Sequence, residues 1–468
     1  MAGGFLPYHE PSIVQILILI SFFLFLSLAE WVSAKIIRAG LIGQIAVGII
    51  YGVPLADILE HNWQETFLAL GYIGLILIIF EGGLGARLDL LKQNFVPSLL
   101  GAATGVVLPI EAVETFIIGS ALCSTSLGTT FAVISSASKT VDLAQTRVGS
   151  ILVSAAVIDD VVGLVFSSII GDLGELSHQN HVNLGWIIGR PIVASVAMAI
   201  LTPLLTKYIF APLFRRFIEF HFARYDHISN IILMVLVLCA FISIAAYAGT
   251  SVLFGSFLAG SFLTYIPSKR PESPFVVMSR EQGEREEDKS PTFVHTFEAY
   301  LMGVQAYLME PLFFASVGFA IPFVGLWTGK RIWRGVLYTL LMAVAKKKRR
   351  RQEEAKEPEP QTGSATAERR SDETLKPSAT WQSALLLGSA MVARGEIGLL
   401  IIEIGYNQTD YLSEEGFITG VWAILLNTII GPVVVGVLVS QYGHLIGESD
   451  WGLQREEDVE QRGDSHRH

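Results

Sequence analysis

Apolar runs about as long as a bilayer is thick dominate this chain. A hydrocarbon core about 30 Å thick needs roughly 20 apolar residues in a helix, and about thirteen stretches meet this criterion. The expected spans are residues 13–34, 41–59, 65–83, 95–110, 112–136, 147–170, 186–210, 227–248, 250–266, 309–327, 330–346, 381–404 and 416–441. These runs predict an all-α polytopic membrane protein with about thirteen transmembrane helices.

Composition supports the same class. Only 16% of the 468 residues are charged, and 51% are hydrophobic, whereas soluble proteins carry roughly a quarter charged residues. The net charge of −10 does not indicate a nucleic-acid partner, because the charges lie in loops rather than on one face. Cys123 and Cys239 fall inside apolar runs, which argues against a disulfide framework. The first run is too long for a signal-peptide core and has no basic stretch ahead of it, so we expect a retained span.

Basic residues alternate between successive loops. Lys and Arg occur after the first, third, fifth, seventh and ninth spans and in the run "KKKRRR" at 346–351, whereas the loops near 57–65, 111–114, 171–184 and 405–415 contain none. The short turn with Lys330 and Arg331 is the exception. The positive-inside rule therefore predicts an N-terminus outside or in a lumen and a C-terminus in the cytosol. Either the plasma membrane or an endomembrane fits this arrangement.

The chain divides into one membrane domain and a tail. We expect the membrane domain to cover residues 12–442, with cytosolic loops at 267–300 and 346–380, and a polar cytosolic tail at 443–468. The stretch "TFEAYLMGVQAYLMEPLFF" is amphipathic and is expected to lie at the membrane interface before the tenth span. No GxGxxG motif follows a strand, so neither a nucleotide-binding regulatory domain nor a cofactor is expected.

Two adjacent carboxylates lie near the middle of the sixth span. Asp159 and Asp160 occur in "SAAVIDDVVGLV", with no basic residue within several positions. Even mild insertion scales assign a cost of about 2.5–3.5 kcal/mol to one Asp at a helix centre. Two such residues favour a functional site over a purely structural role.

Two other spans contain helix-breaking segments. The fifth contains "CSTSLGTT", rich in hydroxyl groups, and the twelfth contains "SAMVARGEIG", with Arg394 and Glu396 beside glycines. These segments are seven spans apart, which fits six helices, one linker helix and six more as an inverted repeat with broken helices facing each other at the midplane. Half-helix ends there present partial charges that hold ions or side chains.

Six motifs, in order, resemble those of a known family. They are "LGYIGLILIIFEGGLGARLDLL" (70–91), "STSLGTTFAV", "VIDDVVGL", "TSVLFGSFLAG" (250–260), "MEPLFFASVGFAI" (309–321) and "MVARGEIGLLI". Together they are similar to those of the monovalent cation/proton antiporters, and most similar to the second, Kef-type family and its fungal-like Na⁺(K⁺)/H⁺ exchangers. The resemblance covers most of residues 12–442.

The resemblance implies a homodimer in which a six-helix core moves the site across the lipid bilayer. It implies exchange of Na⁺ or K⁺ for H⁺, with Asp160 as the essential ligand of both cation and proton. Asp159 would be a second titrating acid, paired with a basic residue on the eleventh span, for which Lys346 is the candidate.

The remaining site residues follow from the same motifs. Thr125 and Ser126 would add hydroxyl oxygens, which are hard ligands suited to Na⁺, Li⁺ or K⁺. Arg394 and Glu396 would be supporting charges near the crossing of the broken helices. The chain departs from the family at the fourth and eleventh spans, which are short, as though each had lost a segment.

Three other functions compete with antiport. A proton- or sodium-coupled solute symporter fits the same intramembrane acids. An aspartyl protease needs two aspartates that face each other from different helices, whereas adjacent residues on one helix diverge by about 100°. A channel would repeat its filter symmetrically, and this chain has one acidic site between unlike halves.

Overall fold

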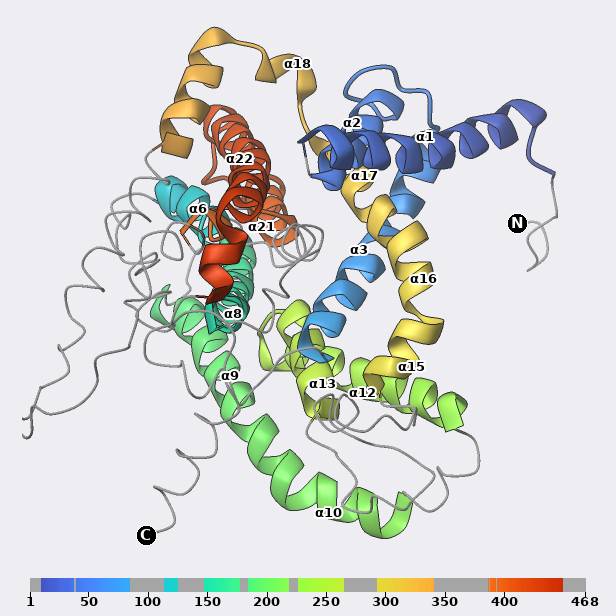
Figure 1. Cartoon of the computed structure of the whole chain (residues 1–468), viewed down its shortest axis with the longest axis vertical. Coiled ribbons are helices and arrows are strands. Elements are labelled where there is room, and N and C mark those ends of the chain that lie inside the picture. The colour runs from blue at the N-terminus through green and yellow to red at the C-terminus, as the bar shows by residue number, and fades with distance from the viewer. Residues whose placement is uncertain are drawn as a thin grey trace, which may run out of the picture. The chain divides into compact units, whose positions relative to one another are not determined.

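The computed structural model describes most of the expected spans and leaves the fourth undescribed. Residues 10–37, 39–84, 113–124, 147–176, 184–218, 226–264, 293–340, 386, 388–392 and 394–448 are described. Within these ranges the chain forms helices and no strands (Figure 1). This is the all-α fold that the apolar runs predict.

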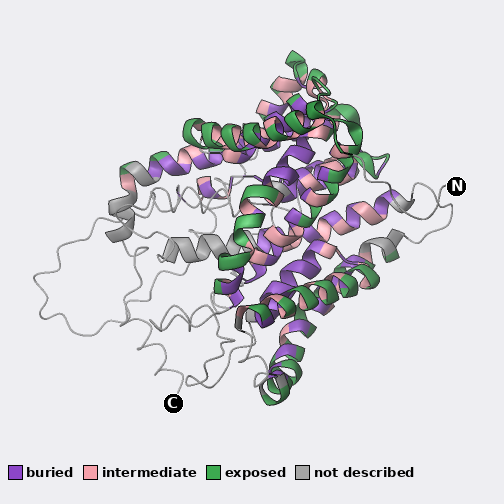
Figure 2. Ribbon diagram, turned by 90° about the vertical axis from the view of Figure 1, so that its right-hand side faces the viewer, coloured by how far each residue is buried: buried purple, intermediate pink, exposed green. Residues whose placement is uncertain are grey.

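Among the described residues, eight apolar helices are candidates for the membrane-embedded part of the chain, five of them long enough to cross a bilayer. Those long enough to cross a bilayer are Ile13–Ile37, His61–Leu84, Gly189–Leu213, His227–Ala248 and Glu414–Leu438, and shorter apolar ones are Gly40–Tyr51, Val252–Leu263 and Ile397–Asn407. Exposed positions run along the faces of whole helices in Figure 2, and on α1 (Ile13–Ile37) they include Leu17, Ile20 and Leu24. Apolar side chains on the outside are what lipid contact requires.

The first compact unit contains residues 1–78 and 297–327. Here α17 (Glu310–Ala320) packs against α2 (Gly40–Tyr51) through glycines: a Cβ on Gly48 would collide with the backbone of Ala315, and one on Gly318 with that of Ile45. Small residues let membrane helices approach at backbone distance, where dispersion contacts replace the hydrophobic effect. Phe22 and Phe67 stack beside this pair, with ring centroids 5.4 Å apart.

The second unit contains residues 79–296 and 328–468. Its described helices include α6 (Val113–Ala121), α8 (Arg147–Leu176), α9 (Leu184–Leu205), α12 (Asp226–Ala248), α13 (Val252–Thr264), α21 (Glu396–Asn407) and α22 (Glu414–Glu448). Helix α21 packs against α8, α6 and α22 (Figure 1). The expected cation-binding residues lie in this unit.

The described part of the twelfth span is interrupted where the sequence predicts a break, and the helix of the fifth span ends where one is predicted, with residues 125–136 outside the described residues. Helix α6 ends at Ala121, in the middle of the fifth expected span, and residues 122–124 are not helical. In the twelfth span, residues 388–390 are helical, residues 391, 392, 394 and 395 are not, and α21 begins at Glu396. Each interruption frees backbone N–H and C=O groups that need other partners.

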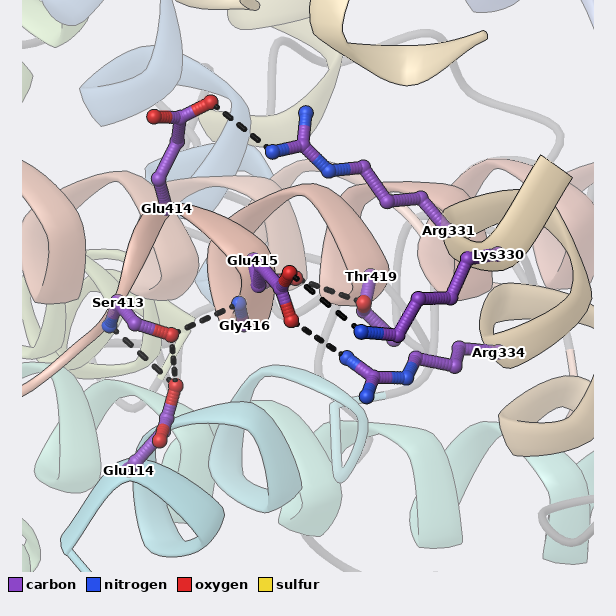
Figure 3. Close-up of polar contacts among 9 residues, drawn as sticks. All are labelled: Glu114, Lys330, Arg331, Arg334, Ser413, Glu414, Glu415, Gly416 and Thr419. Carbon is purple, nitrogen blue, oxygen red and sulfur yellow. Dashed lines mark hydrogen bonds and ion pairs between the residues drawn. The ribbon is translucent and has the colours of Figure 1, made fainter. Parts of the chain in front are cut away.

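A polar cluster surrounds the beginning of α22 (Figure 3). Ser413 caps this helix by accepting a hydrogen bond from the Gly416 amide at 3.1 Å, and its own hydroxyl donates to Glu114 Oε1 of α6 at 2.5 Å. The basic turn that breaks the loop alternation belongs to the same cluster, because Arg331 pairs with Glu414 at 3.3 Å.

Three segments that the sequence predicts on one side of the membrane thus meet, namely the loops at 111–114 and 405–415 and the turn at 330–331. Lys330 approaches Glu415 at 3.8 Å and Arg334 approaches it at 2.7 Å. The exceptional basic turn is therefore balanced by the two acids at the start of α22.

Some helix bounds differ from those expected from hydropathy. Helix α2 ends at Tyr51 rather than at 59, and the apolar residues after it fold back, with the Leu59 amide bonded to Tyr51 O. The tenth span continues upstream through η4 (Gln305–Met309) and α16 (Met302–Val304) to α15 (Phe293–Tyr300). Helix α22 reaches Glu448, beyond the expected end of the last span.

Candidate functional site

The paired carboxylates lie near the middle of α8, a helix of 30 residues. At 1.5 Å per residue this helix is about 45 Å long, which is enough to cross the hydrocarbon core as the sixth span is predicted to do. Asp159 is 4% exposed and Asp160 is 8% exposed. The adjacent acids predicted from the sequence are thus buried together inside the second unit.

The interruption after α6 contacts one of these carboxylates directly. The Ser124 hydroxyl donates to Asp160 Oδ1 at 3.0 Å, and Ser124 is itself buried. A hydroxyl that donates to a carboxylate oxygen fixes the direction of that oxygen. Asp160 is therefore held toward the break in the fifth span.

The interruption before α21 carries a fully buried arginine. Arg394 is 1% exposed, and its Nη1 donates to Ser124 O at 2.8 Å and to Met391 O at 3.1 Å. The charges of Asp159 and Asp160 act on this guanidinium. One side chain thus joins both interrupted helices and satisfies carbonyls that the breaks leave without helical partners.

Helix α22 supports the same interruption from another direction. The Thr428 hydroxyl donates to Arg394 O at 2.8 Å, and Thr428 is 1% exposed. One residue before it, Asn427 is completely buried. The backbone at Arg394 is therefore bonded through its carbonyl to α22 and through its side chain to the end of α6.

Glycines bring the interruptions and α8 close together. A Cβ on Gly398 would lie 2.6 Å from Ala121 O, so α21 touches the backbone at the end of α6. On α8, one turn after the carboxylates, a Cβ on Gly163 would lie 3.2 Å from both Ser124 Cβ and Ile397 Cγ2. Small residues at these positions permit the hydrogen bonds from Ser124 and Arg394 to form.

Not every predicted site residue is described. Thr125, Ser126 and Lys346 lie outside the described residues, and Glu396 is described only as the first residue of α21. Their roles stay predictions. Asp160 and Arg394 both bond to Ser124, and the roles of Asp159, Asp160 and Arg394 also stay predictions.

The structure adds Ser124 and Thr428, which were not among the predicted site residues. Ser124 stands next to the predicted Thr125 in the same hydroxyl-rich stretch, so the stretch held the signal without indicating which hydroxyl faces Asp160. Thr428 belongs to "LLNTIIG", a polar pair within an apolar span. That pair was a detectable signal, since polar groups at the bilayer centre are costly.

Carboxylate, hydroxyl and backbone carbonyl oxygens are the donors gathered here. These hard ligands suit alkali cations better than soft metals. A carboxylate in this position can hold either a proton or a cation, and charge neutralisation is needed in either case because the surroundings are apolar.

Comparison with known proteins agrees with this chemistry. Residues 18–347 match the family described as "Sodium/hydrogen exchanger, transmembrane". A Na⁺/H⁺ antiporter of Enterococcus hirae is 25% identical over 427 residues, which cover 87% of this chain and 94% of the relative. The Na⁺/H⁺-K⁺ antiporter GerN of Bacillus cereus is 25% identical over 423 residues, covering 86% of this chain and 91% of the relative.

The family match covers well over half of the chain and includes the α8 carboxylates, and the relatives' alignments cover most of it. Membership places the protein among cation/proton antiporters rather than among enzymes, against the protease alternative. The Kef-type and fungal-like detail stays a prediction. The chain belongs to the sodium/hydrogen exchanger family of multi-pass membrane transporters.

Proposed function

We propose that this antiporter exchanges Na⁺ or K⁺ for protons at Asp160, by alternating access through a site shared with Asp159. The observation that carries the proposal is the buried Asp160 carboxylate, hydrogen-bonded to the interruption after α6. The relatives are named as antiporters of Na⁺ and H⁺, and one of them also of K⁺. These names support either cation as cargo.

Competition at a single carboxylate supplies the coupling. An ionised Asp160 in an apolar setting is costly unless a proton or a cation neutralises it. If only neutralised states cross the membrane, each inward cation requires an outward proton at the same oxygen atoms. Ser124 keeps Oδ1 oriented in the ionised state, and the incoming ion would bind at the same carboxylate.

Arg394 has a different part in this proposal. Its bonds to Ser124 O and Met391 O hold the two interruptions as one body, so that Asp160 and Ser124 move together. Its positive charge acts on both carboxylates without replacing the proton or the cation at Asp160. Asp159 would then add a second proton, with Lys346 as its partner in the cation-free state.

Assembly and orientation belong to the same proposal. We infer a homodimer from the resemblance, an N-terminus outside or in a lumen, and a C-terminus in the cytosol. The loop alternation supports this orientation, and the ion pairs of Lys330, Arg331 and Arg334 with Glu414 and Glu415 account for its one exception.

The test compares two Asp→Asn variants on one helix. Asp160→Asn in proteoliposomes should abolish cation-driven proton flux while folded protein remains in the membrane. Asp172→Asn, further along α8, is the matched control and should retain flux. Flux retained by Asp160→Asn would refute the assignment of the shared ligand.

A further inference from the structure

The middle of α22 holds a buried amide with both polar atoms unsatisfied. Asn427 has no exposed surface, and neither Oδ1 nor Nδ2 has a hydrogen-bond partner among the described residues. Buried side-chain amides are nearly always hydrogen-bonded, because leaving one unpaired costs its full desolvation. In a membrane helix this indicates an occupant beside the amide.

Its neighbours fix where Asn427 lies. The adjacent Thr428 bonds to Arg394 O, and Ile424, one turn earlier, lies 3.9 Å from a Cβ on Gly398. Residues three apart share a helix face, so Asn427 lies on the side of α22 that packs against the interruption and the start of α21. Figure 1 shows α22 running beside α21.

Most neighbouring polar atoms are engaged, although Arg394 Nε, like the two polar atoms of Asn427, makes no hydrogen bond within the described part of the chain. Arg394 Nη1 bonds to Ser124 O and Met391 O, and the Thr428 hydroxyl bonds to Arg394 O. The Asn427 amide, in contrast, makes no hydrogen bond to any described residue through either of its polar atoms. Its Oδ1 is a neutral hard oxygen, which can coordinate an alkali cation without adding negative charge to a site that already has two carboxylates.

We propose that Asn427 Oδ1 is a further ligand of the transported cation, at the interruption before α21. The inference rests on the proposed function. It adds to the cation site a residue that lies outside the six sequence motifs. The cation would be Na⁺ or K⁺, partly dehydrated, and Asn427 would approach it from α22. Asn427 then determines cation affinity and not the proton affinity of the site.

The experiment replaces the amide by an apolar side chain of similar size. Asn427→Leu should raise the KM for Na⁺ or K⁺ by about tenfold or more in proteoliposomes, the effect of losing one polar contact to a charge. The pH dependence of exchange at saturating cation should stay as in the wild type. Added NaCl or KCl should also stabilise purified Asn427→Leu against heating less than it stabilises the wild type.

Asn230→Leu is the matched control. Asn230 is also buried in the second unit, on α12, and its Oδ1 likewise makes no hydrogen bond to a described residue, but its Nδ2 donates to Thr296 Oγ1 at 3.0 Å. Its replacement should lower thermal stability and leave the KM for the cation unchanged. A KM for Asn427→Leu within about twofold of the wild type would overturn the inference and would indicate a bound water or a structural partner instead.

The inference and the proposed function fail in different ways. Absence of exchange by the wild type with any cation would contradict the proposed function. Exchange by the wild type that is lost in Asp160→Asn, together with an unaltered cation KM in Asn427→Leu, would leave the function standing and remove Asn427 from the site.

Discussion

Replacing Arg394 by Gln tests how the two interruptions are held together. The variant removes charge-assisted hydrogen bonds at 2.8 Å and 3.1 Å from a guanidinium that is 1% exposed. A hydrogen bond to a charged group contributes about 1.5–3 kcal/mol, so the loss amounts to about 3–6 kcal/mol. At about 2 °C per kcal/mol, the melting midpoint should fall by about 6–12 °C.

Transport should be lost with the same substitution. Without Arg394, Ser124 O has no guanidinium donor, and the Asp160 carboxylate bonded to the Ser124 hydroxyl loses its fixed position. The assays are thermal unfolding of purified protein in detergent and cation-driven proton flux in proteoliposomes. A shift below about 2 °C with flux intact would refute the account of the interruptions.

Arg190→Gln is the control for this prediction. Arg190 also donates to two backbone carbonyls, those of Ala248 and Tyr247, each at 3.3 Å, but it is exposed to its surroundings. The Arg190→Gln substitution should lower the melting midpoint by less than a third of the shift expected for Arg394→Gln, and it should leave proton flux unchanged. Equal effects at both positions would show that burial of Arg394 is not the cause.

Two further substitutions address coupling and packing. If the Asp159–Lys346 pair separates on cation binding and Asp159 releases a second proton, exchange is electrogenic. The Asp159→Asn variant should then still exchange ions but no longer respond to an imposed membrane potential. An active wild type that gives no current on a solid-supported membrane would contradict this prediction. Gly398→Ala places a Cβ 2.6 Å from Ala121 O and should cost about 1–3 kcal/mol and reduce flux. Gly388→Ala, which meets nothing within 4 Å, should be neutral or slightly stabilising, and equal behaviour of the two variants would count against close packing at the crossing.

Hydropathy predicts which segments are helices better than it predicts where they end. The fold class follows from apolar length alone, yet α2 stops at Tyr51 although apolar residues continue. Gly52 and Pro54 favour a turn there, and Leu59 is buried at 1% exposure by folding back rather than by extending the helix. An apolar residue packed in a returning loop has the same hydropathy as one in a span.

The site was predictable to the level of motifs and not of individual contacts. The paired acids and the arginine of the interrupted span are rare inside membranes, so the sequence draws attention to Asp159, Asp160 and Arg394, whereas the roles predicted for them come from the resemblance. Which hydroxyl of the fifth span faces Asp160 depends on where α6 ends, and periodicity does not give the direction of a broken helix. Ser124 was therefore found only from the arrangement in space.

Asn427 and Thr428 are also residues whose place at the site the sequence did not predict. Both are ordinary polar residues within an apolar span, and sequence alone does not distinguish a packing role from a place at the site. The Thr428 hydroxyl lies 2.8 Å from Arg394 O and equally 2.8 Å from Ile424 O, and its contact with Arg394 O joins α22 to the interruption. The sequence alone therefore does not tell which group a buried polar side chain will bond to.

Proton flux in proteoliposomes, measured for each alkali cation in turn, tests the central claim most directly. Purified wild type would be reconstituted with a pH-sensitive dye inside, and Na⁺, K⁺ or Li⁺ would be added outside without any organic solute. The account predicts that at least one cation drives protons out of the vesicles as it enters, and that Asp160→Asn removes this flux. Proton movement in the same direction as the cation, or none with any cation, would contradict antiport at Asp160.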